Sequence, residues 1–215
     1  MDNLTLMFLN TWSLWEKEPD YNSYLGLAEN LDEKGYAVSF GDNPFDDDKV
    51  GEKVYMHILN RADKYVHIIT PYLILDDGLL MALKYFAERG IDTKLILPGI
   101  PDKKAVYALA ETYFRTLLNS GVEIYLYTPG FVHAKVFVSD DKKAVVGTIN
   151  LDYRSLYHHF ESGTYLYGAK CITDIEADYQ ATPSKCEKVT YESIKKEKAF
   201  VQLRGRFMRL IAPLL

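Results

Sequence analysis

Short apolar runs alternate with helical segments between residues 36 and 127, and this alternation constrains the fold more than any other feature. The runs are rich in β-branched and aromatic residues, and the segments between them carry apolar residues at helical spacing. The predicted strands are 36–40, 65–70, 92–97 and 122–127, and the predicted helices are 50–62, 78–89 and 103–118. A strand–helix–strand rhythm predicts a mostly parallel sheet with helices on both faces.

The expected helix ends agree with this division. Acidic side chains that can cap a first turn precede each helix: Asp46 to Asp48, Asp76 with Asp77, and Asp102. Gly90 and Gly121 follow the second and third helices, where a left-handed residue ends a helix. The cluster at 46–48 also raises the question of a metal site, but capping explains it better.

The rhythm changes after residue 127. Residues 131–139 and 144–149 are predicted to form a hairpin around the turn 140–143, followed by a strand at 161–167. Further helices are predicted at 3–15, 171–181, 186–197 and 199–213. We therefore expect an α/β fold with a mixed, mostly parallel sheet and helices on both faces. We expect one domain over residues 1–215, made of a helical lead-in (1–34), an α/β core (35–168) and C-terminal helices (169–215).

Composition restricts the classes of function. The 215 residues carry a net charge of −5, so no nucleic-acid partner is expected. The two cysteines, Cys171 and Cys186, are too few for a disulfide framework or a metal site, and free thiols are expected. No apolar run reaches the roughly 18 residues of a membrane span, and the first residues lack the basic flank of a signal peptide. Residues 199–213 form a basic amphipathic pattern that either lies on a membrane or, as we favour, packs on the sheet.

Two exposed faces are predicted to carry side chains of interest. Leu4, Phe8, Trp12 and Trp15 share one face of the first helix, which indicates docking rather than cofactor binding. His133 and Lys135 share one face of the strand 131–139, because strand side chains alternate, while Val132, Ala134 and Val136 point into the core. An ammonium beside a titratable imidazole suits a phosphate, although for that pair alone a strand with two polar residues on its wet face is the better explanation.

The residues that follow favour the phosphate interpretation. Asp140, Gly147, Thr148 and Asn150 complete the pattern His133-x-Lys135-x4-Asp140-x6-Gly147-Thr148-x2-Asn150. This pattern resembles the signature of the phospholipase D superfamily, whose members act on phosphodiesters. The flanking residues resemble bacterial cardiolipin synthase over nearly the whole chain from residue 5: Asn150 to Ser155, Phe160-Glu161, Thr70 to Tyr72, Gly121-Val122, Pro129 to Phe131 and Pro213 to Leu215. Only the carboxyl-terminal half of such an enzyme is covered, and the family's second His-x-Lys is absent from this chain.

Each residue of the pattern has an expected role. Lys135 and the Asn150 amide can donate to non-bridging phosphate oxygens, and the Gly147-Thr148 turn allows close approach and adds a hydroxyl. His133 must act with a second histidine, one attacking phosphorus and the other transferring protons; the resemblance makes His133 the acid and base.

Five further side chains are assigned less directly. Glu161, at the family's acidic position, can orient a histidine. Asp140 belongs to the motif but points to the other face, so we expect a structural hydrogen-bonding role. His67, inside the apolar run 65–70, is expected to be a core histidine with a backbone partner. His158 and His159 stand where many relatives have Asn, and the spacing argues against a catalytic role. No metal or cofactor is expected, since Lys and His supply the positive charge.

The resemblance implies the carboxyl-terminal catalytic half of a cardiolipin synthase. Its expected partners are phosphatidylglycerol and other anionic phospholipids, together with an amino-terminal half that carries the second motif. The parent protein is expected at the cytoplasmic side of the cell membrane, and this piece of it is expected to be soluble. A single-motif phosphodiesterase or nuclease acting as a homodimer is the main alternative. A non-enzymatic module that docks on lipid head groups or a partner is the other.

Overall fold

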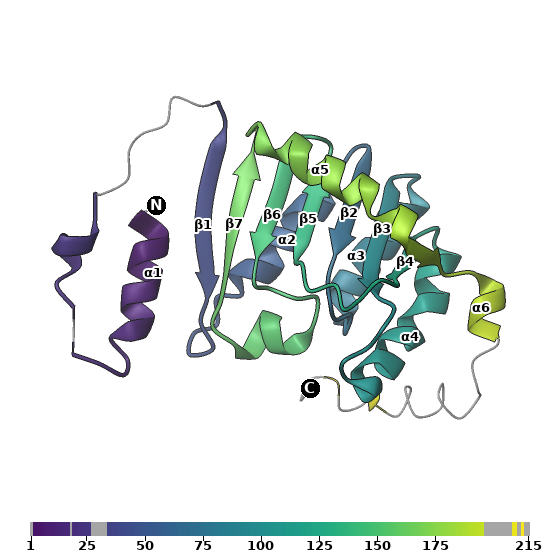
Figure 1. Cartoon of the computed structure of the whole chain (residues 1–215), viewed down its shortest axis with the longest axis horizontal. Helices are drawn as coiled ribbons and strands as arrows, with labels where there is room; N and C mark the ends of the chain where they lie inside the picture. The colour runs from purple at the N-terminus through teal and green to yellow at the C-terminus, as the bar shows by residue number, and fades with distance from the viewer. Residues whose placement is uncertain (1, 18, 27–33, 196–207, 210–211, 213–215) are drawn as a thin grey trace.

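One eight-stranded sheet organises the chain (Figure 1). The computed structural model describes residues 2–17, 19–26, 34–195, 208, 209 and 212. Across the sheet the strands run in the order β1-β7-β6-β5-β2-β3-β4-β8. Their bounds are β1 Tyr36–Asp42, β2 Tyr65–Ile69, β3 Asp92–Pro98, β4 Glu123–Tyr127, β5 Val136–Ser139, β6 Lys143–Gly147, β7 Glu161–Tyr167 and β8 Cys186–Lys188.

The sheet is mixed, as predicted, but most of its pairs are antiparallel. Only β2–β3 and β3–β4 are parallel, whereas β1–β7, β7–β6, β6–β5, β5–β2 and β4–β8 are antiparallel. The expectation of a mostly parallel sheet is therefore wrong. The βαβ rhythm supplies just the three neighbouring strands β2, β3 and β4, because β5 to β7 follow as a meander and β1 and β8 add antiparallel edges.

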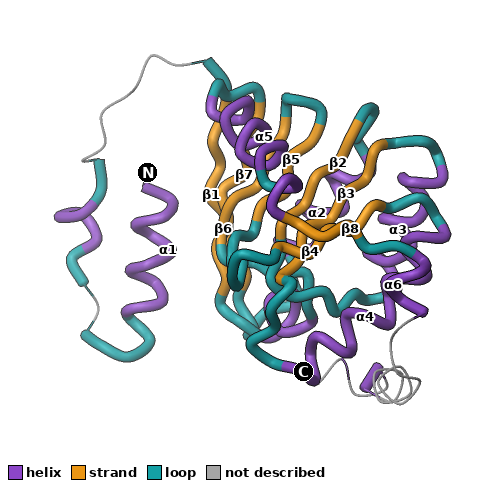
Figure 2. The backbone as a smooth tube through the Cα atoms, turned by 45° about the vertical axis from the view of Figure 1, so that its right-hand side comes forward, coloured by secondary structure: helices purple, strands orange, loops and turns teal. Residues whose placement is uncertain are grey.

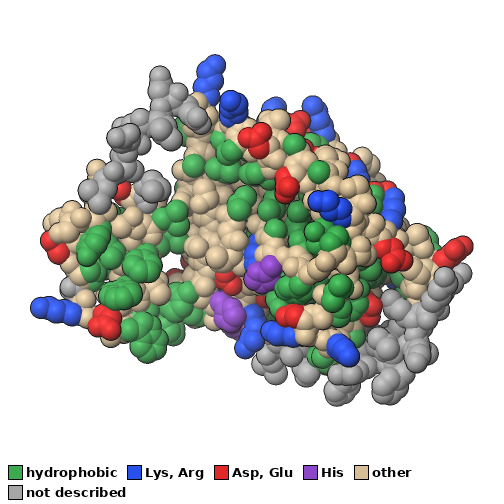
Figure 3. Space-filling view, in the orientation of Figure 1, with side chains coloured by type: hydrophobic (Ala, Val, Ile, Leu, Met, Phe, Trp, Pro, Cys, Tyr) green, Lys and Arg blue, Asp and Glu red, His purple; other side chains and the backbone are tan. Residues whose placement is uncertain are grey.

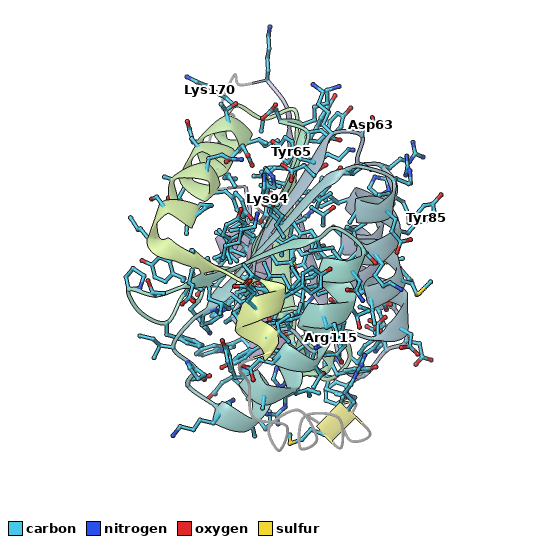
Figure 4. All side chains as sticks on the ribbon, turned by 90° about the vertical axis from the view of Figure 1, so that its right-hand side faces the viewer. Asp63, Tyr65, Tyr85, Lys94, Arg115 and Lys170 are labelled. Atoms are coloured by element: carbon cyan, nitrogen blue, oxygen red, sulfur yellow. The ribbon has the colours of Figure 1, made fainter. Side chains whose placement is uncertain are left out.

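Helices cover both faces of the sheet, as predicted. α2 (Val50–Asn60), α3 (Asp77–Glu88) and α4 (Lys104–Asn119) lie on one face, and α5 (Cys171–Ala181) crosses the other (Figures 1 and 2). The larger core packs Leu83 and Phe114 of the first layer with Phe137 of β5. On the other face Ile172 packs against Val138 and Ala144. The side view shows the same layers, with α5 on one side of the sheet and α3 and α4 on the other (Figure 4).

The helix starts follow the predictions in part. Asp76 caps α3, since its carboxylate accepts a hydrogen bond from the Leu79 N–H at 2.9 Å. At α2 the side chain that accepts is Asp42, from the N–H groups of Val50 and Gly51 at 2.7 and 2.9 Å, and not the cluster at 46–48. Asp102 does not cap α4, because it accepts from the Tyr72 hydroxyl at 2.5 Å. Both capping predictions are wrong because the contacts of Asp42 and Asp102 depend on the path of the loop before each helix, which the local sequence pattern does not show.

The C-terminal region also departs from the predictions. Residues 186–197 do not form one helix, since β8 pairs with β4 and α6 (Tyr191–Lys195) begins only afterwards. The open edge of β4 offers unpaired N–H and C=O groups, and pairing them outweighs a weak helical pattern. The predicted helix 199–213 lies outside the described residues except at positions 208, 209 and 212. Cys171 and Cys186 are free thiols, as expected.

The first helix, α1 (Asp2–Trp12), lies beside β1 in both ribbon views (Figures 1 and 2). It ends at Trp12, so the prediction of a helix to residue 15 is wrong and Trp15 lies beyond the helix. The rest of the predicted stripe is largely exposed: Leu4, Phe8 and Trp12 retain 40%, 61% and 50% of their accessible surface. The rings of Phe8 and Trp12 contact each other at 5.7 Å between centroids. α1 thus presents an apolar face that the described part of the chain does not cover.

Short helical turns complete the described elements. They are Tyr21–Tyr24 after α1, the π-helical turn Arg154–His158 between β6 and β7, and Pro183–Lys185 before β8. Among the described residues, no helix is long and apolar enough to cross a membrane.

Candidate active site

His133 and Lys135 lie in an extended segment immediately before β5, at the edge of the sheet where β2 ends. The strand begins at Val136 rather than at residue 131, so the predicted strand is too long and Ala134 is exposed rather than buried. Its neighbour explains the difference, because Ile69 is the last residue of β2 and pairs with Val136. With no partner strand beyond that point, His133 is exposed and Lys135 is half-buried.

The side chains of these two residues meet. The Lys135 ammonium lies 2.9 Å from Nδ1 and 3.1 Å from Nε2 of the imidazole, and it donates to the His133 carbonyl oxygen at 2.7 Å. Burial lowers the pKa of Lys135, and the charges of Glu161 and Asp152 oppose this shift without cancelling it. A partly buried ammonium is poorly solvated, which strengthens its attraction for an anion.

An open cavity of about 500 Å³ joins most of the predicted residues. Its lining includes His133 and Lys135 from one side and Gly147, Thr148 and Asn150 from the other. Gly147 ends β6, and a Cβ there would collide with the Ser162 carbonyl of β7. The glycine is therefore required for close packing of two strands, in addition to any approach of a ligand.

A hydrogen-bond network lies behind this cavity. Thr148 Oγ1 donates to Oε2 of Glu161, and the buried hydroxyl of Ser155 donates to Oε1 at 2.8 Å. The Asn150 amide nitrogen donates to the same Ser155 hydroxyl at 2.9 Å. Ser155 was not singled out from the sequence as a site residue, although its place five positions after Asn150 in the motif extension is a usable signal.

The contacts of Asn150 and Glu161 differ from the roles predicted for them, which are donation to a phosphate and orientation of a catalytic histidine. The Asn150 nitrogen contacts Ser155, and its Oδ1 atom is buried with no hydrogen-bond partner among the described residues. The histidine beside Glu161 is His159, with Nδ1 3.6 Å from Oε1. That Glu161 orients a catalytic histidine therefore stays a prediction.

Asp140 lies outside the cavity, at the other end of β5. Its carboxylate accepts hydrogen bonds from the backbone N–H groups of Asp63, Lys64 and Tyr65 at 3.0, 2.9 and 3.1 Å. Burial opposes ionisation, but the hydrogen bonds from Tyr65, Asp63 and Lys64 outweigh it and hold the pKa of Asp140 below its usual range. Asp140 and Asp141 both have positive φ, 58° and 56°, as in the primed turns that suit hairpins.

The buried histidine of β2 has carboxylate partners rather than the expected backbone partner. His67 Nδ1 lies 2.9 Å from Glu176 of α5, and Nε2 lies 3.3 Å from Asp92. Tyr65 and Lys94 belong to the same region of the sheet (Figure 4). This cluster lies on the α5 face, and the described residues contain no group of His, Cys, Asp and Glu that fits a metal ion.

Solved structures show which class of protein this fold defines. The Nuc protein of Salmonella typhimurium, a phospholipase D family member, aligns with a TM-score of 0.62 at 13% identity, covering 73% of this chain and 99% of that chain. Phosphatidylserine synthase of Haemophilus influenzae aligns with a TM-score of 0.65 at 19% identity, covering 83% and 48%. At such identities the likeness concerns the fold, which is that of a phospholipase D-like α/β domain.

Sequence comparison then identifies the family. The model described as "Cardiolipin synthase, PLD-like domain" matches residues 55–182, and the chain belongs to this family. An uncharacterized protein of Streptococcus mutans is 54% identical over 99% of this chain and 46% of its own length. Cardiolipin synthases of Clostridium perfringens and Halalkalibacterium halodurans are 40% and 32% identical, over 75% and 99% of this chain. The chain spans 34% and 42% of those two relatives, which is less than half of each.

Proposed function

We propose that this chain is the carboxyl-terminal catalytic half of a cardiolipin synthase, which transfers a phosphatidyl group between two phosphatidylglycerols and releases glycerol. The observation that carries the proposal is the cavity in which His133 and Lys135 face Gly147, Thr148 and Asn150. That cavity holds one His-x-Lys pair, and the sequence contains no second one. The relatives named cardiolipin synthase are more than twice as long, which leaves room for a second pair in a partner half.

The chemistry divides between two histidines. The partner half's histidine attacks phosphorus and forms a phosphohistidine, while His133 gives a proton to the departing glycerol oxygen. His133 then takes a proton from a hydroxyl of the second phosphatidylglycerol, whose oxygen attacks the phosphohistidine. Lys135 donates to the non-bridging oxygens, where negative charge is greatest in the transition state. The incoming phosphate draws the Lys135 ammonium from the imidazole and frees that ring for proton transfer.

Such substrates require the parent protein to work at a membrane surface. We place the parent protein at the cytoplasmic face of the cell membrane, where its partners are anionic phospholipids. Neither a metal nor a cofactor enters the proposed reaction.

A homodimeric phosphodiesterase is the second candidate. The structural likeness to Nuc supports this candidate, because the alignment covers 99% of the Nuc chain. A single domain of this kind can therefore make up a whole protein chain. The net charge of −5 argues against a polyanionic nucleic-acid substrate. Gel filtration and a nuclease assay of this chain separate the two candidates.

The decisive experiment is a chimera in which this chain replaces the matching 46% of the Streptococcus mutans relative. We expect the chimera to convert phosphatidylglycerol vesicles into cardiolipin and glycerol, and the His133→Ala chimera to be about 10²–10⁴-fold slower. The 215-residue chain alone is expected to be nearly inactive. Robust cardiolipin formation by the isolated chain, or an inactive chimera beside an active unaltered relative, would refute the proposal.

A further inference from the structure

A second cleft, of about 680 Å³, lies between α1 and the edge of the sheet. Its apolar walls come from α1 and the residues just after it on one side, and from the loops that flank β1 and β7 on the other. The apolar side chains of these walls are Leu4, Met7, Phe8, Leu14, Phe45 and Phe160. In the space-filling view hydrophobic side chains gather over α1, across a hollow from the sheet (Figure 3).

This cleft adjoins the phosphate cavity. Thr148 lines both spaces, and its hydroxyl donates to Glu161, which also lines the cleft. Thr148 and the Glu161 carboxylate that it contacts thus lie where the two spaces meet. A ligand with its phosphate beside Lys135 would place its tail in the cleft by passing Thr148.

The lining chemistry selects what can follow that path. Among the described residues that line the cleft, none is Lys, Arg or His, and two, Asp42 and Glu161, are acidic. A polyanionic strand would meet these carboxylates with no compensating cation. A hydrocarbon chain would instead bury apolar surface against the aromatic and aliphatic walls, which is favourable.

We propose that the cleft between α1 and β1 binds an acyl chain of the phospholipid whose phosphate occupies the His133 cavity. This inference rests on the proposed function and names the part of this chain that recognises the lipid tail. It also explains why the apolar stripe of α1 is exposed, since Phe8 forms both a wall of the cleft and part of that stripe.

The test measures binding to the full 215-residue chain, without any activity assay. Monomeric dibutanoyl, dihexanoyl and dioctanoyl phosphatidylglycerol are titrated below their micelle concentrations, and glycerophosphoglycerol serves as the probe with no acyl chain. The two tryptophans of the sequence are Trp12 and Trp15. Trp12 contacts the ring of Phe8, a wall of the cleft, so tryptophan fluorescence is expected to respond when the cleft is filled. Affinity is expected to rise about fourfold for each CH₂ that enters the cleft.

Substitutions locate the effect. Phe8→Asp combined with Phe45→Asp changes two exposed cleft residues, the second of which retains 78% of its accessible surface, so the fold should tolerate both. This variant is expected to lose the chain-length dependence and to bind glycerophosphoglycerol as the wild type does. Met81→Asp on α3, also exposed and outside the cleft, is the matched control and should keep the full dependence.

Three outcomes would overturn the inference. Equal affinity for all chain lengths would show that the cleft does not bind acyl chains, even if the chimera makes cardiolipin. Chain-length dependence that survives in the Phe8 and Phe45 variant would place the tail elsewhere. If affinity depends on acyl-chain length in the isolated chain but not in the chimera, the partner half, rather than a lipid, occupies the cleft in the whole protein. Failure of the proposed function is seen separately, as a chimera that binds the lipids and makes no cardiolipin.

Discussion

The ammonium nitrogen of Lys135 lies within 2.9 and 3.1 Å of the two ring nitrogens of His133. An ammonium can only donate and a neutral imidazole offers one acceptor nitrogen, so only one of these two contacts can be a hydrogen bond at a time. A phosphate that binds here would compete with the imidazole for the ammonium.

Replacement of Lys135 is expected to remove transition-state stabilisation more than folding stability. In the chimera, Lys135→Ala should lower kcat/KM by about 10²–10³-fold, the usual cost of losing one donor to a developing oxyanion. Lys135→Arg should retain part of the activity, because it keeps a charged donor. Thermal unfolding of both variants is the control, and an unchanged kcat/KM in Lys135→Ala would contradict the assigned role.

The pH dependence of anion binding should report Lys135 directly. Burial lowers the pKa of this lysine. As the pH rises, its positive charge is therefore lost at a pH below the ordinary lysine pKa of about 10.5. We expect inorganic phosphate, followed by NMR of the isolated chain, to bind at neutral pH and to weaken as the pH approaches that range. Lys135→Arg should bind with no such decline, because arginine keeps its charge. A decline of equal size in this variant would assign the titration to another group.

Ser155 joins the two sides of the network behind the cavity. Its hydroxyl accepts from Asn150 and donates to Glu161, so Ser155→Ala leaves both without that partner. We expect about 1–3 kcal/mol lower free energy of unfolding and about 10–100-fold lower kcat/KM in the chimera, since misplaced groups cost rate. Ser184→Ala, at an exposed turn, is the matched control and should change neither quantity measurably. Equal effects of the two substitutions would remove Ser155 from the site.

Local patterns in the sequence predicted much of the fold. Apolar runs gave β2, β3, β4 and β7 to within about two residues, because a buried strand needs a short continuous set of apolar side chains. The motif correctly predicted that Lys135 and Asn150 line one cavity, although fifteen positions separate them in the sequence. They meet because β5 and β6 pair as a hairpin, which places the segments at its open end side by side.

Contacts between distant segments were not predictable in the same way. The cap of α2 comes from Asp42 across a loop, and the partner of His67 comes from Glu176 on α5, more than a hundred positions away. No periodicity encodes such pairs, because they depend on how layers and loops meet. The strand β8 was missed for the same reason, since an open sheet edge, rather than propensity, determines it.

Asp140 should govern stability in acid rather than catalysis. The pKa of its carboxyl is held low in the folded protein, so its stabilising effect is complete above the unfolded value of about 3.9 and is lost as the pH falls through the folded value. Asp140→Asn is expected to lower the free energy of unfolding by about 1–3 kcal/mol at pH 7. The difference from the wild type should shrink below about pH 4.

Urea unfolding across pH 2.5 to 8 measures this effect. Asp47→Asn, at an exposed position, provides the control with the same change of charge. A pH-independent difference between Asp140→Asn and the wild type would contradict an ionised carboxylate at the turn.

His67 should anchor α5 to the sheet. Its ring stacks between Tyr65 and Tyr179 at 4.4 and 4.5 Å and contacts Glu176 of α5 at 2.9 Å. His67→Ala is expected to lower the free energy of unfolding by about 2–5 kcal/mol, because it opens a cavity between two tyrosines and removes a partner of the Glu176 carboxylate. Amide exchange in α5 should accelerate more than in α3, since two of the lost contacts, with Glu176 and Tyr179, are made to α5. His57→Ala, on the exposed face of α2, is the control. Uniform acceleration across both helices would show that His67 stabilises the whole domain rather than the attachment of α5.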